Sequence, residues 1–409
     1  MGLHRFQPEP SGRMGILSTL VTIKGAALLE FGSMGHMRYG RTLLQRRGVK
    51  ENCRLYATHL DEADISLGGT ERLTRAVEAI ARAHPGQPLF LLPSSVPEIT
   101  GVDLFALSKM MQPDYPENLL VPFGGGGFKT SFYQGVEETL LTLVKVFPKE
   151  REKTGRLTFN LLGTCSDQVK FQSDAREIQR MMAGAFGAEP LVLLSSETSA
   201  EELEGLGAAH INLVIRREGE KAAIHLNERF GTPYSVGRPY GLKASAQWLS
   251  EVGRLLGQEP NPAFLTSETL EVEEVLKAAM PRIRFLKKQN PKKARLSLGG
   301  HTDVVKGIGQ FAKEEAGLDQ GAFWCDSPEM AEEHIPYFSE SRWLKEAEKE
   351  REGIVMARGD LMEYLGKPGE LTLAQPDAYW RLNAYEPPYM GFRGAINLIC
   401  LWYNALFSG

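Results

Sequence analysis

Short apolar runs alternate with longer amphipathic segments along most of the chain. Four runs in its first part have the length and composition of buried strands, at 26–33, 53–60, 88–95 and 118–125. The second run is followed, at 69–84, by apolar residues with helical spacing. Because strands that alternate with helices form parallel sheets covered on both faces, this pattern predicts an α/β fold.

The alternation begins again twice. An apolar run at 155–164 opens a second series, and a run at 294–300 opens a third. A charged stretch at 148–155 separates the first two series, and a long helical stretch at 267–289 precedes the third. We therefore predict three Rossmann-like lobes with mainly parallel sheets, namely 1–150 with the N-terminal segment, 151–290 ending in a long helix, and 291–409. Such sheets bind ligands at the carboxyl ends of their strands.

The composition argues against nucleic acid and membranes as binding partners. The 409 residues are 42% hydrophobic, which is enough for several cores. The net charge of -4 provides no broad positive field to attract nucleic acid or anionic lipid. No stretch is apolar over the length that a bilayer requires. We expect a cytoplasmic protein without nucleic-acid or membrane partners.

The four cysteines are scattered singly along the chain. No CxxC pair and no zinc-binding spacing occurs, which is typical of a protein from a reducing compartment. Cys400 lies in an apolar helical pattern and is expected to be buried. Cys165 follows a predicted strand, so it either faces a cleft or packs in the core, and packing is favoured.

A glycine-rich loop follows the fourth predicted strand, in the sequence LLVPFGGGGFKTSFYQG at 119–135. A nucleotide-binding P-loop has glycine immediately before its lysine, whereas here Phe128 precedes Lys129. Because an aromatic side chain there crowds the amides that wrap a phosphate, the loop does not match an NTP site. His36 and His301 also follow predicted strands, and each is either a cleft residue or a surface or packed histidine, which is the favoured case.

Six segments, in order along the chain, resemble the nitrogenase component 1 family. They are TIKGAALLEFGSMGH, THLDEADISLGGTERLTRAVEAI, PSSVPEITGVDL, PFGGGGFKTSFYQGVEETL, GTPYSVGRPYGLKASAQWL and PPYMGFRGAINLI. This family includes catalytic nitrogenase subunits, their cofactor-assembly scaffold, and tetrapyrrole reductases. The resemblance covers essentially the whole chain, and the three-lobe prediction agrees with the fold that it implies.

The departures from the family concern its iron–sulfur cluster at the subunit interface. The three family cysteines fall on Ser11, His36 and Ser95, so all three thiolates are absent. Sulfide clusters prefer thiolate ligands, and serine or histidine replaces them only occasionally. Either the partner chain supplies most or all ligands, with His36 or a serine as an unusual one, or the cluster is lost. No cysteine aligns with a cofactor-anchoring site, so an iron–molybdenum-type cofactor in this chain is not expected.

The resemblance implies an oxidoreductase subunit of a nitrogenase-like two-component reductase. It would pair with a homologous cluster-bearing subunit as a heterodimer, doubled to a heterotetramer, and would be inactive without that partner. A separate ATP-dependent iron protein would deliver low-potential electrons. Two alternatives remain open: a non-catalytic scaffold for metallocofactor or tetrapyrrole assembly, and a structural pseudo-enzyme partner. A second metallocofactor or a tetrapyrrole substrate in the complex also remains open.

The resemblance places the substrate in a cleft between lobes. We expect this cleft to be lined by Arg38, Lys129, Tyr133 and Gln134 from the first lobe and by His301 and Asp303 from the third. Their charged and phenolic groups are suited to binding a carboxylated substrate or donating protons. The alternative is that they are solvent-facing loop residues. The substrate itself, whether nitrogen, a tetrapyrrole or a small sulfur compound, remains open.

Overall fold

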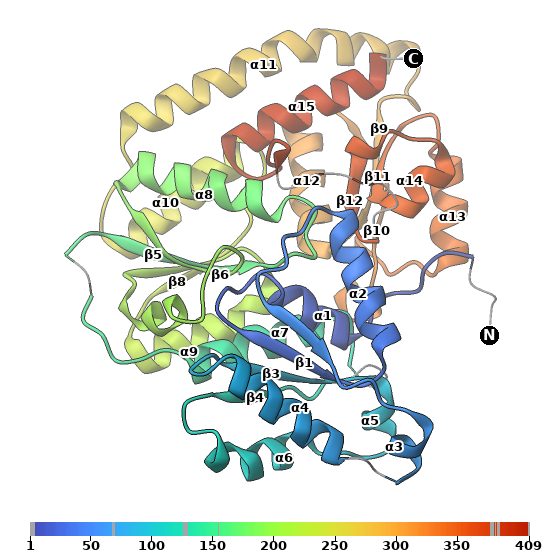
Figure 1. The fold of residues 1–409 in the computed structure, drawn as a ribbon. Helices are drawn as coiled ribbons and strands as arrows, with labels where there is room; N and C mark the ends of the chain where they lie inside the picture. Colours follow the sequence, from blue (N-terminus) through green and yellow to red (C-terminus); the bar gives the residue numbers. More distant parts are fainter. Residues whose placement is uncertain are drawn as a thin grey trace.

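Three parallel four-stranded sheets form the frame of the protein in the computed structural model (Figure 1). The structure describes residues 5–67, 70–125, 130–153, 155–376, 380, 382 and 385–407. Each sheet has the same strand order, in which the first strand of its lobe lies between the second and the third. The expected α/β fold with three Rossmann-like, parallel-sheet lobes is confirmed.

The first sheet runs in the order β2-β1-β3-β4. Its strands are β1 (Ala27–Phe31), β2 (Arg54–Ala57), β3 (Leu89–Pro93) and β4 (Leu120–Pro122). Its helices are α1 (Gly12–Leu20), α2 (Met34–Arg46), α3 (Glu62–Leu67), α4 (Thr70–Ala83), α5 (Ser95–Ile99), α6 (Leu104–Met111) and α7 (Phe132–Val146). The strands lie inside the predicted apolar runs and are shorter than them, because the ends of each run form the loops.

The second sheet runs in the order β6-β5-β7-β8. Its strands are β5 (Thr158–Thr164), β6 (Glu189–Ser195), β7 (Ile211–Val214) and β8 (Tyr234–Val236). Its helices are α8 (Phe171–Phe186), α9 (Glu220–Phe230), α10 (Gly241–Leu256) and α11 (Pro262–Gln289). The long helix α11 starts five residues before the predicted stretch, because the Asn261 side chain caps it and a proline occupies its first position.

The third sheet runs in the order β10-β9-β11-β12. Its strands are β9 (Arg295–Gly300), β10 (Asp319–Cys325), β11 (Ile354–Arg358) and β12 (Thr372–Ala374). Its helices are α12 (Thr302–Glu314), α13 (Glu340–Lys349), α14 (Gly359–Leu365) and α15 (Gly391–Phe407). Short 3-10 turns complete the fold: η1 (Gln112–Asp114), η2 (Glu202–Ala208), η3 (Arg217–Gly219), η4 (Pro328–Met330) and η5 (Gly369–Leu371).

The cores of the lobes are continuous with one another. One hydrophobic cluster joins the second and third sheets, and another joins the first and second. Helix α15 packs on α8, α10 and α11, and it lies beside α11 along one edge of the molecule (Figure 1). The expectation that Cys400 is buried is wrong, since it is exposed on the face of α15 opposite this contact. Cys165 is buried, and burial raises the pKa of its thiol to about 11.

Two helices of the first lobe approach each other unusually closely. A side chain at Gly135 of α7 would place its Cβ 2.1 Å from the backbone oxygen of Gly12 in α1. The Gly12 N–H donates to the Thr130 carbonyl at 2.8 Å. A capping box then starts α7, in which Ser131 and Gln134 exchange hydrogen bonds between side chain and backbone. These contacts set the direction of the first turn of α7, which enters the centre of the molecule.

Candidate functional site

A cavity of about 290 Å³ lies where the three lobes meet. Its wall is built from the starts of α1 and α7, from loops that follow strands of the second sheet, and from loops that follow strands of the third. The position agrees with the rule that parallel sheets bind ligands beyond the carboxyl ends of their strands. The volume is near the lower limit for small-molecule sites and equals that of about ten water molecules.

His301 reaches the cavity from the end of β9. It caps α12, because its Nδ1 accepts a hydrogen bond from the Asp303 N–H at 3.1 Å. Its Nε2 lies 2.9 Å from Oε1 of Glu218, so these partners assign the proton to Nε2. Both ring nitrogens are therefore engaged, and the imidazole offers no lone pair to a metal in the cavity.

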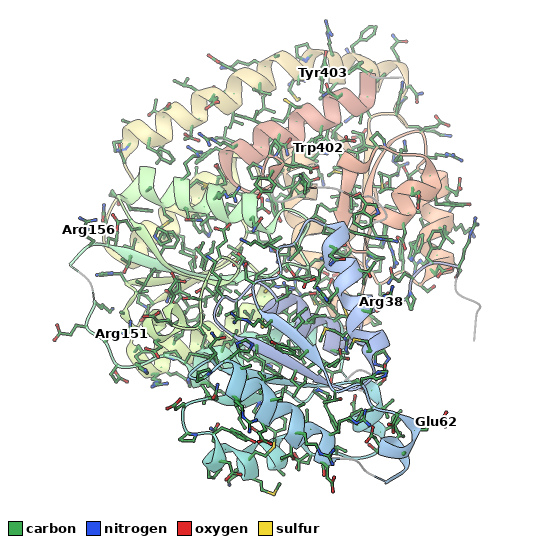
Figure 2. The ribbon with its side chains drawn as sticks, viewed as in Figure 1. Arg38, Glu62, Arg151, Arg156, Trp402 and Tyr403 are labelled. Carbon is green, nitrogen blue, oxygen red and sulfur yellow. The ribbon has the colours of Figure 1, made fainter. Side chains whose placement is uncertain are left out.

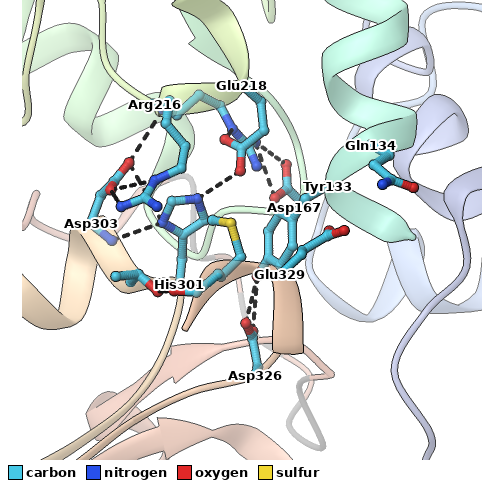
Figure 3. Close-up of polar contacts among 12 residues, drawn as sticks. Tyr133, Gln134, Asp167, Arg216, Glu218, His301, Asp303, Asp326 and Glu329 are labelled. Carbon is cyan, nitrogen blue, oxygen red and sulfur yellow. Dashed lines mark hydrogen bonds and ion pairs between the residues drawn. The ribbon is translucent and has the colours of Figure 1, made fainter. Parts of the chain in front are cut away.

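A buried ion-pair network lies behind His301 (Figure 3). Nε of Arg216 donates to Glu218 at 2.7 Å, and Nη1 donates to Asp167 at 2.9 Å. Arg216 is 1% exposed and Glu218 4%. Burial would raise the pKa of Glu218, but Arg216 and then His301 outweigh it and hold this pKa well below its ordinary value. The network fixes the orientation of His301.

Tyr133 faces the same cavity from the first turn of α7. Its hydroxyl donates to both carboxyl oxygens of Asp326, at 2.8 and 2.9 Å (Figure 3). Its ring meets the His301 ring edge-on, with 5.1 Å between the centroids. Burial raises the pKa of Asp326, and burial together with Asp326 raises that of Tyr133 well above its usual range. The phenol therefore stays protonated and serves as a hydrogen-bond donor.

The other predicted catalytic residues lie elsewhere. The Asp303 carboxylate lies behind His301 and accepts from Nε of Arg217 at 2.8 Å; His301 and Arg217 lower its pKa in spite of its burial. Gln134 is exposed and points away from the cavity (Figure 3), and Arg38 is exposed on α2 (Figure 2). Lys129 lies outside the described residues. The structure thus brings Tyr133 and His301 together at the cavity.

Several charged residues of the cavity wall were not predicted from the sequence. They are Glu9, Arg47, Asp167, Lys170, Asp174, Arg238, Asp326 and Arg358. Asp326 and Arg358 stand at the carboxyl ends of β10 and β11. The rule that ligands bind at this edge of a parallel sheet could therefore have predicted them. Glu9 carried no such signal, because it arrives on a segment whose path depends on contacts with the third lobe.

Two of the three positions of the absent thiolates lie at the carboxyl end of the first sheet. His36 follows β1 and Ser95 follows β3, whereas Ser11 occupies the N-cap position of α1 and lines the central cavity. Nδ1 of His36 is 3.9 Å from Oε1 of Glu30, a buried carboxylate. Glu30 also accepts two hydrogen bonds of 2.6 Å from Arg13. The His36 side chain is 42% exposed.

These donors do not fit an iron–sulfur cluster held by this chain alone. The three positions provide two hydroxyl groups and one imidazole, which are poor substitutes for thiolates. Throughout the part of the chain that the structure describes, no group of three or more His, Cys, Asp or Glu side chains is arranged to hold a metal. Histidine is an established ligand of some iron–sulfur clusters, so His36 is the strongest candidate donor among the three positions.

Apolar side chains are exposed on helices at the same edge of the first sheet as His36. They belong to α2, α3 and α5, which follow β1, β2 and β3 at the same edge of the first sheet (Figure 1). The members are Met34, Tyr39, Ile65 and Ile99. An exposed apolar patch of this kind marks a candidate protein–protein contact. As for membranes, none of the helices within the described ranges combines the length and the apolar character of a bilayer span.

Comparison with known proteins identifies relatives over most of the chain. The family model for nitrogenase component 1 type oxidoreductases matches residues 11–407. A light-independent protochlorophyllide reductase subunit of Jannaschia sp. (strain CCS1) is 25% identical over 81% of this chain, which spans only 64% of that relative's length. The nitrogenase vanadium-iron protein beta chain of Trichormus variabilis (strain ATCC 29413 / PCC 7937) is 24% identical, with 95% of this chain and 90% of the relative covered.

A further relative and a solved structure complete the comparison. The nitrogenase iron-molybdenum cofactor biosynthesis protein NifE of Bradyrhizobium diazoefficiens is 23% identical over 86% of this chain and 65% of its own length. The solved structure of nitrogenase Cp1 at pH 6.5 superposes with a TM-score of 0.77 at 16% identity, covering 100% of this chain and 94% of that one. At this identity the superposition establishes the shared fold. The resemblance found in the six sequence segments is confirmed.

Proposed function

Because the chain belongs to the nitrogenase component 1 type oxidoreductase family, we propose that it is one subunit of a nitrogenase-like two-component reductase. The observation that carries the proposal is the cavity between the three lobes of a chain that matches this family over nearly its whole length. In this proposal the ligand binds in the cavity, and Tyr133 and His301 are the predicted site residues that line it.

The partner in this proposal is a homologous subunit that carries the cluster thiolates. It docks on the exposed apolar patch at the same edge of the first sheet as His36, and two such heterodimers form a heterotetramer. An ATP-dependent iron protein delivers the electrons. The arrangement of His36 supports a limited contribution from this chain, because its Nδ1 lies 3.9 Å from the buried Glu30 carboxylate and its side chain is 42% exposed. The chain by itself is then inactive.

The decisive experiment is iron and acid-labile sulfide analysis with EPR, on the purified chain and on its complex with the partner. We expect the chain alone to be free of iron and the complex to contain a cluster that the iron protein reduces. A complex without iron that accepts no electrons would contradict the proposal. A stoichiometric cluster in the isolated chain would show that the ligands do not come from the partner.

The contribution of His36 is tested separately in the same complex. If the imidazole is a ligand, His36→Ala alters the EPR signal of the cluster or lowers its iron content. His334→Ala is the matched control, because His334 is an exposed histidine of the third lobe. An unchanged EPR signal in His36→Ala would leave all cluster ligands with the partner.

The similarity to NifE favours one other candidate function, a scaffold for cofactor assembly. A scaffold would bind a metallocofactor or tetrapyrrole and release it to an acceptor protein, without catalytic turnover. ATP-dependent reduction of a substrate by the complex would identify the enzyme. Transfer of bound metal to an acceptor, without such turnover, would identify the scaffold.

A further inference from the structure

Asp326 differs from the other aspartates around the cavity. Asp167 pairs with Arg216, and Asp174 accepts the backbone N–H groups of Tyr389 and Met390 at 2.7 and 3.0 Å. The Asp326 carboxyl group instead receives the Tyr133 hydroxyl, and within the described chain it forms no ion pair. A carboxyl group that is half-buried with a phenol as its partner is poorly compensated as an anion.

The fold aims this carboxyl group at the cavity. Asp326 is the first residue after β10, and its N–H donates to the Gly300 carbonyl at 3.3 Å, at the end of the neighbouring strand. Tyr133 reaches it from α7 of a different lobe, across 193 positions of sequence. Both residues line the cavity. The carboxyl group is therefore fixed at the junction of two lobes, on the cavity wall.

A second carboxyl group, that of Glu9, lies at the same wall of the cavity and makes the ionised form of Asp326 less favourable. The N-terminal segment is tied to the third lobe by the Arg5 N–H, which donates to Glu340 at 2.8 Å, and by Arg358, which donates to the Gln7 carbonyl. This path brings Glu9 to the cavity near Asp326. Burial and then the charge of Asp326 raise the pKa of Glu9 to about 7. Two neighbouring carboxyl groups of this kind do not both ionise readily at neutral pH.

We propose that Asp326, held by the Tyr133 hydroxyl, is a proton donor to the ligand that binds in the central cavity. This inference rests on the proposed function, in which a ligand is reduced there. For each two-electron reduction, the iron–sulfur reductase supplies two electrons and the ligand takes up two protons. The O–H bond of Asp326 breaks as an X–H bond forms on the ligand, with an electron pair that the ligand has received. Solvent supplies the second proton and reprotonates Asp326.

The protonation of Asp326 depends on groups from every element packed around it. The charged and titratable neighbours are Tyr133 on α7, His301 at the start of α12, Glu9 on the N-terminal segment, Arg358 at the end of β11, Glu329 in η4, Cys325 at the end of β10, and Tyr337. His301 and Arg358 stabilise the carboxylate, whereas burial opposes it more strongly. Tyr133 acts as a positioning residue, because it orients the carboxyl group and stabilises the anion that remains after donation.

The experiment compares infrared difference spectra of the full chain at pH 7 with pH–rate profiles of the complex. We expect the wild-type spectrum to contain the C=O band of a protonated carboxyl group that Asp326→Asn removes and Tyr133→Phe shifts. Asp319→Asn is the matched control at the other end of β10, where Asp319 pairs with Lys287; it should remove no such band. Thermal unfolding checks that each variant is folded.

In the complex, Asp326→Asn should lower the rate of substrate reduction by about 100-fold or more, the range of general acid catalysis. The wild-type rate should decline as the pH rises through the pKa of Asp326, and the variant should lack this decline while its cluster is still reduced. A wild-type spectrum without the carboxyl band, or an Asp326→Asn complex with the wild-type rate, would overturn the proposal. A wild-type complex whose cluster accepts no electrons would contradict the proposed function instead, and the carboxyl band would still decide whether Asp326 holds the proton.

Discussion

Replacing Glu218 by glutamine tests whether the buried network holds the centre of the molecule together. Glu218 lies between Arg216 at 2.7 Å and His301 at 2.9 Å, and it is almost fully buried. Removing one partner of a buried ion pair costs about 3–5 kcal/mol, because the other charge loses its compensation. Asp167 still pairs with Arg216 in the variant, and the new amide oxygen still accepts from His301. We therefore expect a loss near the lower limit, about 3 kcal/mol at pH 7.

The sign of the pH dependence follows from the lowered pKa of Glu218. A carboxyl group whose pKa is lower in the folded state stabilises the fold above its ordinary pKa of about 4.3, and this stabilisation is lost as the pH falls towards the folded pKa. The difference between wild type and Glu218→Gln should thus be complete at pH 7. It should shrink only in acid, below the ordinary carboxyl pKa.

Urea unfolding followed by tryptophan fluorescence measures this difference. With an m-value of about 3 kcal/mol per molar urea, the midpoint should fall by about 1 M. Glu137→Gln is the matched control, because Glu137 forms an exposed ion pair of 2.6 Å with Lys221 and should cost about 0–1 kcal/mol. If Glu218→Gln unfolds at the same urea concentration as Glu137→Gln, the network does not stabilise the fold as argued.

Two further predictions concern the α1–α7 contact and the N-terminal segment. Gly135→Ala should destabilise the fold by about 2 kcal/mol or more, because its Cβ would overlap the backbone of Gly12. Gly205→Ala should cost less in the same urea titration, because its Cβ would make only an ordinary contact, 3.9 Å from Nη1 of Arg151. The wild type should lose stability as the pH rises from about 4.5 to 7, because a carboxyl group with a raised pKa favours the folded state only while it is protonated. Glu9→Gln should remove this loss. Solvent exposure of Glu9 limits that loss to about 1 kcal/mol or less, and equal thermal midpoints of the two proteins at pH 8 and at pH 5 would show that Glu9 is not desolvated in the folded state.

Most of the fold could be predicted from hydrophobic periodicity. Apolar runs such as 155–164 and 294–300 contain β5 and β9, because central parallel strands are buried on both faces and are apolar almost throughout. Cys400 shows where this reasoning fails. A helix that is apolar around most of its circumference does not reveal which face meets its neighbours, and α15 packs through the face of Leu398 and Trp402.

The candidate site could be predicted only in part. Tyr133 and His301 were found because a residue that starts a helix after a strand stands at the ligand-binding edge of its sheet. Asp303 and Gln134 occupy the same first turns, yet one pairs with Arg217 and the other closes a capping box. Sequence spacing does not separate these roles, because the direction of a side chain depends on partners from another lobe.

The edge of the first sheet explains how the chain folds without the three thiolates. A chain that lacks the cluster must balance, by other contacts, the charges that would have faced it. Here the buried Glu30 is neutralised by two hydrogen bonds from Arg13, so the site is electrostatically complete without metal. His36 is the exposed group that remains, at the same sheet edge as an apolar patch suited to a partner. Because this edge needs no metal to balance its charges, we expect the stability of the chain to be unaffected by iron chelators, in contrast to domains whose metal binding is coupled to folding.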